Sequence, residues 1–348
     1  TTAPTPVADA DGTAADDGAT TEDESTTTTV VEGPLAYEGY GGTAEAAGMT
    51  WTAQQCAFPD GHRIGDRASE HFSSLAVTGD GVFLAGQDGT EGTGLAKYQP
   101  TAGGDGCVLT VDASWGDGGV LHFDREIDYV TGSPSGRLAA SRSVFTTWIV
   151  DGASGASIEC DGGDRTDLSP DGAVAYGHFP GSPELDRYEI DGSGCVVTSG
   201  AVTVASQDNP TAGGWIDDDL YLIGGFNDEG ASVTALDRSG NERWRAGGSR
   251  IDDGETGYGT ITAVAPCGPH VCVLDSNFRD VHVLERGGGE QIGLLDLREL
   301  SGLPINWFND LATGPDGALW VAAGLDQLLP SGESAEQIQG LVYRIEIS

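Results

Sequence analysis

The segment "WFNDLATGPDGALWVAAG" (residues 307–324) consists of two short apolar stretches joined by a Pro-Asp-Gly turn. This pattern predicts a β-hairpin, because Gly supplies the positive φ that a tight turn needs. The same phrase occurs five more times, as "SLAVTGDGVFLAG" (74–86), "DYVTGSPSGRLAAS" (128–141), "TDLSPDGAVAYG" (166–177), "GGWIDDDLYLIG" (213–224) and "TAVAPCGPHVCVLD" (262–275). The turns lie near positions 81, 136, 172, 218, 268 and 317, so the phrase returns about every 47 residues. That period is typical of propeller blades.

A second hairpin follows every copy except the last. These hairpins are "LAKYQPTAGGDGCVLTVDASW" (95–115), "TWIVDGASGASIEC" (147–160), "DRYEIDGSGCVVTSG" (186–200), "VTALDRSGNERWRAG" (233–247) and "VHVLERGGGEQIGLLDL" (281–297). The chain holds 55 Gly, and its best helical candidate, "GLLDLRELSGL" (293–303), is short. Four strands per repeat are the plan of a propeller blade. We therefore predict an all-β chain that folds as a six-bladed β-propeller of four-stranded blades.

The sixth repeat lacks one strand. "GLVYRIEIS" (340–348) supplies its third strand, and there the sequence ends. "MTWTAQQCAF" (49–58) precedes the first full repeat and is the candidate for the missing fourth strand. The N-terminal strand is then expected to close the ring, which removes an exposed sheet edge.

Six Cys allow 15 disulfide pairings. On the blade alignment, Cys56 and Cys160 end outer strands, while Cys107 and Cys195 begin the outer strands of the repeats that follow. The alignment therefore predicts Cys56–Cys107 and Cys160–Cys195 as equivalent links between neighbouring blades. It also predicts Cys267–Cys272 across a hairpin.

The expected location is outside the cytoplasm: extracellular, at the cell surface or periplasmic. Three disulfides suit an oxidising compartment. The sequence begins at Thr1 without Met, from which we expect that a leader has been removed. No apolar run approaches the length of a transmembrane helix.

The charge is strongly acidic, with 55 acidic against 16 basic residues and a net charge of −39. A nucleic-acid backbone would be repelled, so nucleic acid is excluded as a partner. Two interpretations stay open. The acidic side chains form a solvated surface suited to salty or extracellular conditions, or they capture cations.

The first 34 residues differ in composition from the rest. Residues 1–34 are rich in Thr, Ala and Gly and hold no basic residue, so we expect a tail or linker ahead of a propeller over residues 35–348. The Thr hydroxyls offer sites for O-glycans. "TTTTVVEG" (26–33) is rich in β-branched residues and is suited to pairing with a sheet edge of a neighbouring molecule. A protein partner or self-association is therefore expected.

Two further segments carry a family resemblance. "DASWGDGGVLHFDREIDYVTGSPSGRLAAS" (112–141) and "VCVLDSNFRDVHVLERGG" (271–288) resemble NHL repeats, and residues 307–324 resemble both NHL and gluconolactonase-type propellers. The resemblance implies a ligand site where the central channel opens. The residues of this chain expected there are His71, Asp128, Arg142, His178, Trp307, Phe308, Asn309 and Asp310.

The gluconolactonase type holds a divalent metal with Glu, Asn and Asp. The resemblance would place Asn309 and Asp275 in such a site, with Glu70 or Glu126 as the Glu, and oxygen ligands suit Ca²⁺. Asn309 and Asp310 serve equally well as residues that cap a loop by hydrogen bonds to the backbone.

Other enzyme classes find less support. The six His fall at no constant blade position, which argues against the three-His zinc site of the related lyases; they are His62, His71, His122, His178, His270 and His282. Arg142 alone is too little for a quinone-dependent dehydrogenase, and no Gly-x-Ser-x-Gly motif occurs. The leading hypothesis is an exported binding or scaffolding module without a cofactor or catalytic residues. The alternative is a metal-dependent hydrolase or lactonase that uses Ca²⁺ or another divalent cation.

Overall fold

The computed structural model describes residues 41–60, 73–88, 92–102, 106–125, 127–142, 146–161, 163, 165–192, 194–228, 230–247, 257–302, 305, 307–328 and 334–348. Over these residues the chain forms 26 strands and one short helix, so it is an all-β protein. The predicted tail, residues 1–34, lies outside the described residues, as do His71, Glu70 and Glu126.

Sixteen strands form four separate antiparallel sheets of four strands each. In chain order they are β8 (Tyr129–Gly132), β9 (Arg137–Arg142), β10 (Thr146–Asp151) and β11 (Ser157–Asp161); β12 (Arg165–Leu168), β13 (Val174–His178), β14 (Glu184–Ile190) and β15 (Cys195–Thr203); β16 (Asn209–Asp217), β17 (Leu220–Asn227), β18 (Gly230–Asp237) and β19 (Glu242–Gly247); and β20 (Ile261–Cys267), β21 (His270–Asp275), β22 (Asp280–Leu284) and β23 (Gln291–Asp296). Each strand pairs with the next in sequence, because short turns return the chain directly.

The remaining strands form one ten-stranded sheet. Its main path is β24 (Trp307–Thr313), β25 (Leu319–Leu328), β26 (Ser334–Ile347), β2 (Met49–Ala57), β6 (Cys107–Val111), β5 (Gly92–Ala102), β4 (Gly81–Asp88) and β3 (Ser74–Thr78). Two strands branch from this path: β1 (Thr43–Ala46) pairs with β2, and β7 (Val120–His122) pairs with β5. As expected for the closing strand, β2 pairs antiparallel with the last strand, β26, and it also pairs parallel with β6. The two ends of the path, β24 and β3, are joined by side-chain hydrogen bonds, so the path nearly closes on itself.

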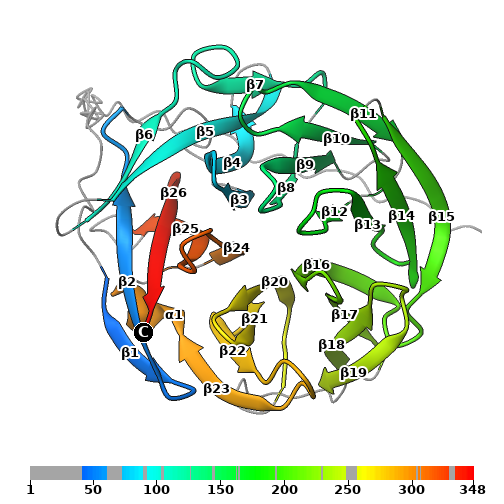
Figure 1. Ribbon diagram of the computed structural model, residues 1–348. Coiled ribbons are helices and arrows are strands. Elements are labelled where there is room, and N and C mark those ends of the chain that lie inside the picture. The colour runs from blue at the N-terminus through cyan, green and yellow to red at the C-terminus, as the bar shows by residue number, and fades with distance from the viewer. Residues whose placement is uncertain are drawn as a thin grey trace, which may run out of the picture. The chain divides into compact units, whose positions relative to one another are not determined.

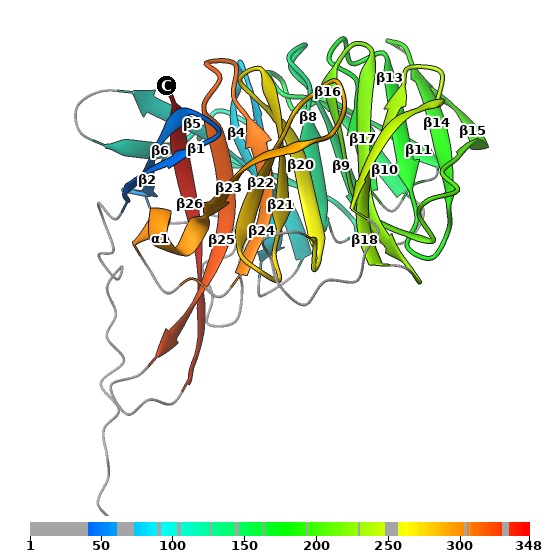
Figure 2. The ribbon, with the colours of Figure 1, turned by 90° about the horizontal axis from the view of Figure 1, so that it is seen from below.

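The sheets stand around a common centre in a β-propeller arrangement (Figure 1). The innermost strands are β3, β8, β12, β16, β20 and β24, and each is the first strand of a predicted inner hairpin. Figure 2 shows the sheets from the side, with the β25–β26 hairpin extending beyond the others.

All six predicted inner hairpins are present in the structure. Two of their turns show why Gly recurs there. Gly172 and Gly317 adopt φ values of +67° and +81°, which side chains with a Cβ rarely accept. In both turns an Asp before the Gly receives a backbone hydrogen bond: Asp171 from the amide of Ala173, and Asp316 from the amide of Ala318.

The hydrophobic core lies between adjacent sheets. Six of the seven Trp are buried, namely Trp51, Trp115, Trp148, Trp215, Trp244 and Trp320, and only Trp307 is exposed, at 40%. Two of the buried indole N–H groups donate to carbonyls of neighbouring segments, that of Trp215 to Asp167 and that of Trp244 to Arg286. Aromatic side chains therefore fill the space between the blades, as propeller packing requires.

The three disulfides join the pairs that the blade alignment predicts: Cys56–Cys107, Cys160–Cys195 and Cys267–Cys272. Cys56–Cys107 joins β2 to β6, which pair within the ten-stranded sheet, whereas Cys160–Cys195 joins β11 to β15, the outer strands of two separate sheets. The third lies within the β20–β21 hairpin.

Three elements are additions to the predicted plan. Strands β1 and β7 extend the large sheet, and α1 (Leu297–Ser301) lies within the weak helical candidate at 293–303. Asp296 caps α1 by accepting hydrogen bonds from the amides of Arg298 and Glu299. Strands of three or four residues carry too few positions for a clear alternation, which is why β1 and β7 have no sequence signature.

Candidate functional site

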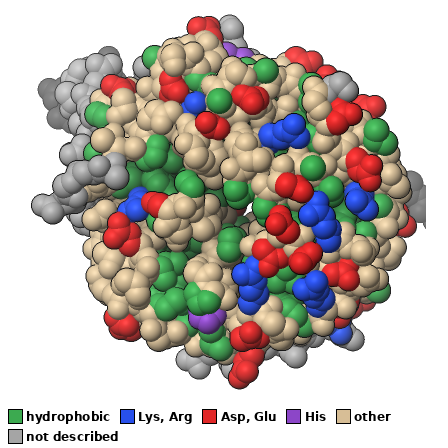
Figure 3. Space-filling model, viewed as in Figure 1, with side chains coloured by type: hydrophobic (Ala, Val, Ile, Leu, Met, Phe, Trp, Pro, Cys, Tyr) green, Lys and Arg blue, Asp and Glu red, His purple; other side chains and the backbone are tan. Residues whose placement is uncertain are grey.

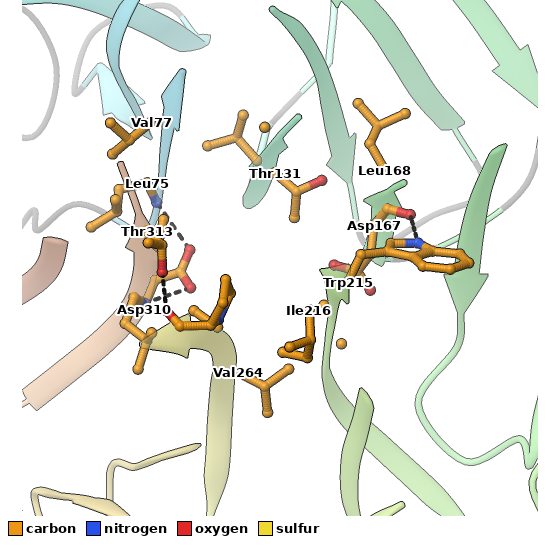
Figure 4. Close-up of a pocket in the computed structure, with 18 of the residues that line it drawn as sticks. Leu75, Val77, Thr131, Asp167, Leu168, Trp215, Ile216, Val264, Asp310 and Thr313 are labelled. Carbon is orange, nitrogen blue, oxygen red and sulfur yellow. Dashed lines mark hydrogen bonds between the residues drawn. The ribbon is translucent and has the colours of Figure 1, made fainter. Parts of the chain in front are cut away.

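A cavity of about 150 Å³ lies where the six innermost strands converge. Each of β3, β8, β12, β16, β20 and β24 contributes lining residues (Figure 4). The space-filling view shows a hollow near the centre of the ring (Figure 3). A concave site in the middle of the fold, reached by several strands, is the usual setting for a small ligand.

The cavity wall is about equally polar and apolar. Its aliphatic side chains come from several parts of the ring, including Leu75, Val77, Val130, Leu168, Ile216 and Val264. Two carboxyl groups interrupt this wall, Asp310 from β24 and Asp167 from β12. Both are almost fully buried, with 3% and 1% of their surface exposed.

Asp310 is held by three donors. Its Oδ2 receives hydrogen bonds from the Leu75 amide (3.0 Å) and from the hydroxyl of Ser74, and its Oδ1 receives one from the Leu311 amide (2.8 Å). The Ser74 oxygen also lies 3.1 Å from the carbonyl of Val130 and accepts a hydrogen bond from the amide of Val130. Ser74 therefore connects β24, β3 and β8.

The Ser74 hydroxyl has one proton and two acceptors within reach, Asp310 Oδ2 and the Val130 carbonyl. A protonated Asp310 removes this conflict, because it donates to Ser74 while Ser74 donates to Val130. Burial raises the pKa of Asp310 to about 7, against the opposing effect of its hydrogen bonds. The hydrogen-bond geometry and the pKa both favour a bound proton near neutral pH.

Asp167 lies between two tyrosines. Its Oδ1 accepts a hydrogen bond from the Tyr129 hydroxyl (3.1 Å), and its Oδ2 accepts one from the Tyr221 hydroxyl (2.8 Å). Burial raises the pKa of Asp167 to about 6, although both hydroxyls lower it. The pKa values of Tyr129 and Tyr221 are raised well above the ordinary value by burial, so both phenols stay neutral and can only donate to the carboxylate.

Gly213 makes this arrangement sterically possible. A Cβ at position 213 would lie 2.0 Å from Asp167 Oδ2 and 2.2 Å from the Tyr221 hydroxyl. Neither atom can move without breaking the hydrogen bond between them. Gly213 of β16 is therefore required for the hydrogen bond between Asp167 and Tyr221.

Arg165 contributes a positive charge to the cluster. Its guanidinium donates to the carbonyls of Thr211 on β16 and Thr262 on β20, and it lies 4.9 Å from the centre of the Tyr129 ring. Arg165 also lowers the pKa of both Asp167 and Asp310 by its charge. One side chain thus reaches three inner strands and acts on both carboxyl groups.

His178 is completely buried next to Asp167, with Nε2 3.8 Å from Oδ2. Burial, together with the charge of Arg165, lowers the pKa of His178 to about 3. The imidazole is therefore neutral, and the contact is not an ion pair. Neither ring nitrogen has a well-aligned hydrogen-bond partner.

Three Asp residues at the turns after the inner strands differ from Asp167 and Asp310 because each of them pairs with an Arg. Asp171 pairs with Arg238 at 2.9 Å, Asp316 pairs with Arg344 at 2.8 Å, and Asp217 pairs with Arg286. These pairs are partly exposed, and acidic and basic side chains are mixed on this face (Figure 3). Each of these acids has its own cation, whereas Asp167 and Asp310 share Arg165.

Of the residues predicted at the channel mouth, only two belong to this cluster. Asp310 lines the cavity and His178 contacts Asp167. Phe308 is buried in the apolar core, and Trp307 is exposed at the start of β24. Three residues, Asp128, Arg142 and Asn309, are half-buried and do not line the cavity. His71 lies outside the described residues.

The sequence hypothesis missed Ser74, Tyr129, Arg165, Asp167 and Tyr221. One signal was available: "TDLSPDG" (166–172) and "NDLATGPDG" (309–317) both place Asp-Leu in an inner strand ahead of a Pro-Asp-Gly turn. The structure places both of these Asp residues in the cavity wall.

Of the residues named for a metal, Glu70 and Glu126 lie outside the described residues, and Asp275 has backbone partners. Asp275 is fully buried, and its carboxylate accepts hydrogen bonds from four backbone amides, those of Gly259, Thr260, Asn277 and Phe278. This is the role of a residue that caps a loop. Within the described part of the chain, no group of three or more His, Cys, Asp or Glu is arranged to hold a metal ion.

Among the described residues, no helix is long and apolar enough to cross a membrane.

No family model matches the sequence, and no curated protein matches it. Among solved structures, the chain is similar to the hydrazine synthase of Kuenenia stuttgartiensis, with 14% sequence identity and a TM-score of 0.45. The match covers 72% of this chain and 79% of that chain. The likeness is distant, and neither the fold nor the site described above rests on it.

Proposed function

We propose that this chain is an exported six-bladed β-propeller that works as a binding module, with the central cavity as the ligand site. The observation that supports binding is the cavity itself, a space lined by aliphatic side chains and polar groups, with two buried carboxyl groups in its wall. Apolar contacts combined with a small number of placed polar groups are typical of sites that orient a small ligand. We assign no catalytic residue.

Six blades result if the ten-stranded sheet is counted as two blades. Its main path divides into β24-β25-β26-β2 and β6-β5-β4-β3, and the only strand pairing between these two halves in the described structure is the parallel pairing of β2 with β6. Each half then has four strands, as the four separate sheets do. On this count β2 is the outer strand of the last blade and closes the ring.

Export is supported by the three disulfides, because such bonds form and persist in oxidising compartments. Kinship with NHL and gluconolactonase-type propellers is proposed from the sequence phrases alone. For residues 1–34 we propose contacts with other molecules, on the basis of their polar composition and the β-branched run at 26–33.

Binding in the cavity is tested by filling it. Thr131 is half-buried in the cavity wall (Figure 4), so a larger side chain there should occupy the space. Saturation-transfer NMR with a set of neutral and charged fragments should detect binding to the wild-type protein and its loss in Thr131→Phe. The matched control is Thr198→Phe on the exposed face of β15. Equal fragment binding by Thr131→Phe and wild type would reject the cavity as the site.

A further inference from the structure

The charge of the buried cluster is unbalanced. With both carboxyl groups ionised, Asp167 and Asp310 carry two negative charges, and Arg165 is the cation that acts on both. The other titratable groups near them in the described structure are Tyr129 on β8, His178 on β13 and Tyr221 on β17, and all three are neutral near pH 7. Around the two carboxyl groups, the strands β16, β20 and β3 contribute glycines, apolar side chains and Ser74.

A buried net charge of −1 is unfavourable without a counter-charge. In the unliganded protein a proton can neutralise it, and the Ser74 geometry provides a place for that proton on Asp310. A cation that enters the cavity can do the same while its body contacts the aliphatic part of the wall. The overall charge of −39 favours the approach of cations over anions.

The cavity also restricts the rest of the ligand. Its volume of about 150 Å³ is comparable to that of the engineered cavity in another protein that accepts benzene. Aliphatic side chains form one part of the wall, so the body of the ligand should be apolar and about the size of a single ring. A hydrated metal ion would leave these aliphatic side chains without contacts.

We propose that the cavity binds a small organic ammonium ion, with its apolar body against Leu75, Val130 and Val264 and its charged nitrogen at the carboxyl group of Asp310. This inference rests on the proposed function and names the ligand class of the same site. Below neutral pH the ammonium replaces the proton of Asp310, so one proton leaves for each cation bound. Above neutral pH both carboxyl groups are ionised, and no proton is released.

Benzylammonium, benzyl alcohol and benzoate are suitable probes, because they share a ring and differ in charge. Isothermal titration calorimetry at about pH 8 should give binding of benzylammonium, weaker binding of benzyl alcohol and no binding of benzoate. Asp310→Asn should weaken benzylammonium binding by about 30-fold or more and leave benzyl alcohol nearly unchanged. The matched control is Asp171→Asn, whose carboxylate already pairs with Arg238 at the surface.

The wild-type protein alone provides an independent measurement. Its affinity for benzylammonium should fall about tenfold per pH unit as the pH drops below about 6, because the bound proton must leave. A pH-independent affinity, or benzyl alcohol binding as tightly as benzylammonium, would overturn the ammonium assignment while the cavity stays a binding site. Competition by CaCl₂ at constant ionic strength would overturn it in favour of an inorganic cation. If all three probes fail to bind and fragments bind Thr131→Phe as they bind the wild type, the proposed function fails as well.

Discussion

Ser74 and Asp310 are 236 residues apart in the sequence, and their side chains share a hydrogen bond in the folded chain. The contact joins β3, the first strand of the inner layer, to β24, the last one. It therefore serves two purposes. It ties the ends of the ring together, and it places a buried carboxyl group in the wall of the central cavity.

Ser74→Ala should destabilise the fold. The substitution removes the link to Asp310 and leaves the Val130 amide without its acceptor, in a fully buried place. Loss of a buried hydrogen-bond partner costs about 1–3 kcal/mol of unfolding free energy. Urea denaturation should show this loss, whereas Ser73→Ala, which removes a half-buried hydroxyl bonded to one carbonyl, should show less. Equal effects of the two substitutions would contradict the role of Ser74.

Asp310 should make the protein less stable as the pH rises. Its pKa is about 7 in the folded chain and near 3.8 in the unfolded chain, so the folded state holds the proton more tightly. Its contribution is therefore fully present below about pH 4 and is lost between about pH 4 and 7, by an amount on the order of 4 kcal/mol.

The comparison with Asp310→Asn isolates this effect from the other carboxyl groups. The unfolding free energy of the variant minus that of the wild type should increase from about pH 4 to about pH 8. Denaturation curves at several pH values give this difference. A constant difference over the whole range would show that Asp310 titrates normally.

Gly213→Ala should be among the most damaging small substitutions in the chain. The added methyl group would overlap the Asp167 carboxylate and the Tyr221 hydroxyl. Overpacking of this kind costs about 1–3 kcal/mol and more when a buried hydrogen bond is lost with it. Gly79→Ala is the control, because no atom lies within 4 Å of a Cβ at that position. Thermal unfolding of the two variants should differ clearly, and equal unfolding temperatures would refute the steric argument.

The disulfides should differ in their effect on stability. Cys160–Cys195 closes a loop with a sequence separation of 35, and Cys267–Cys272 closes one of 5. The loop-entropy model gives about 4 kcal/mol for the longer loop and about 2 kcal/mol for the shorter one. Paired Cys→Ser variants measured by chemical denaturation test this order. A larger loss from the 267–272 pair would mean that loop entropy does not decide the effect.

Deleting residues 1–34 should leave the propeller folded and abolish self-association. The reason is the composition of this segment, which offers little apolar surface for docking but a β-branched run for strand pairing. Thermal unfolding and analytical ultracentrifugation of the truncated chain are the measurements. Unchanged assembly, or failure to fold, would remove the proposed role.

The hairpins could be predicted from the sequence because their signals are local. In residues 307–324 the turn and both strands lie within 18 positions, and the β24–β25 pairing follows from them. Repetition then predicted sheets of four strands, of which four are present as separate sheets while the other strands join in one ten-stranded sheet, and the same alignment predicted the cysteine pairs. The β2–β26 pairing was predictable for the same reason, since one strand was missing from the last repeat.

The site was harder to predict because its contacts join different repeats. Asp310 was named from its place in β24, but its partner Ser74 comes from the other end of the ring. Asp167 and Tyr221 meet only because Gly213 leaves room between them, and this close approach has no signature in a single repeat. His178 was named as a ligand residue, but burial makes it a neutral neighbour of Asp167.

The most direct test of the account is a crystal structure of the protein soaked with benzylammonium at about pH 8. The account predicts electron density for the ring inside the cavity, against Leu75, Val130 and Val264, with the nitrogen within hydrogen-bonding distance, about 3 Å, of the Asp310 carboxylate. An empty cavity, or a probe whose nitrogen points away from Asp310, would contradict it.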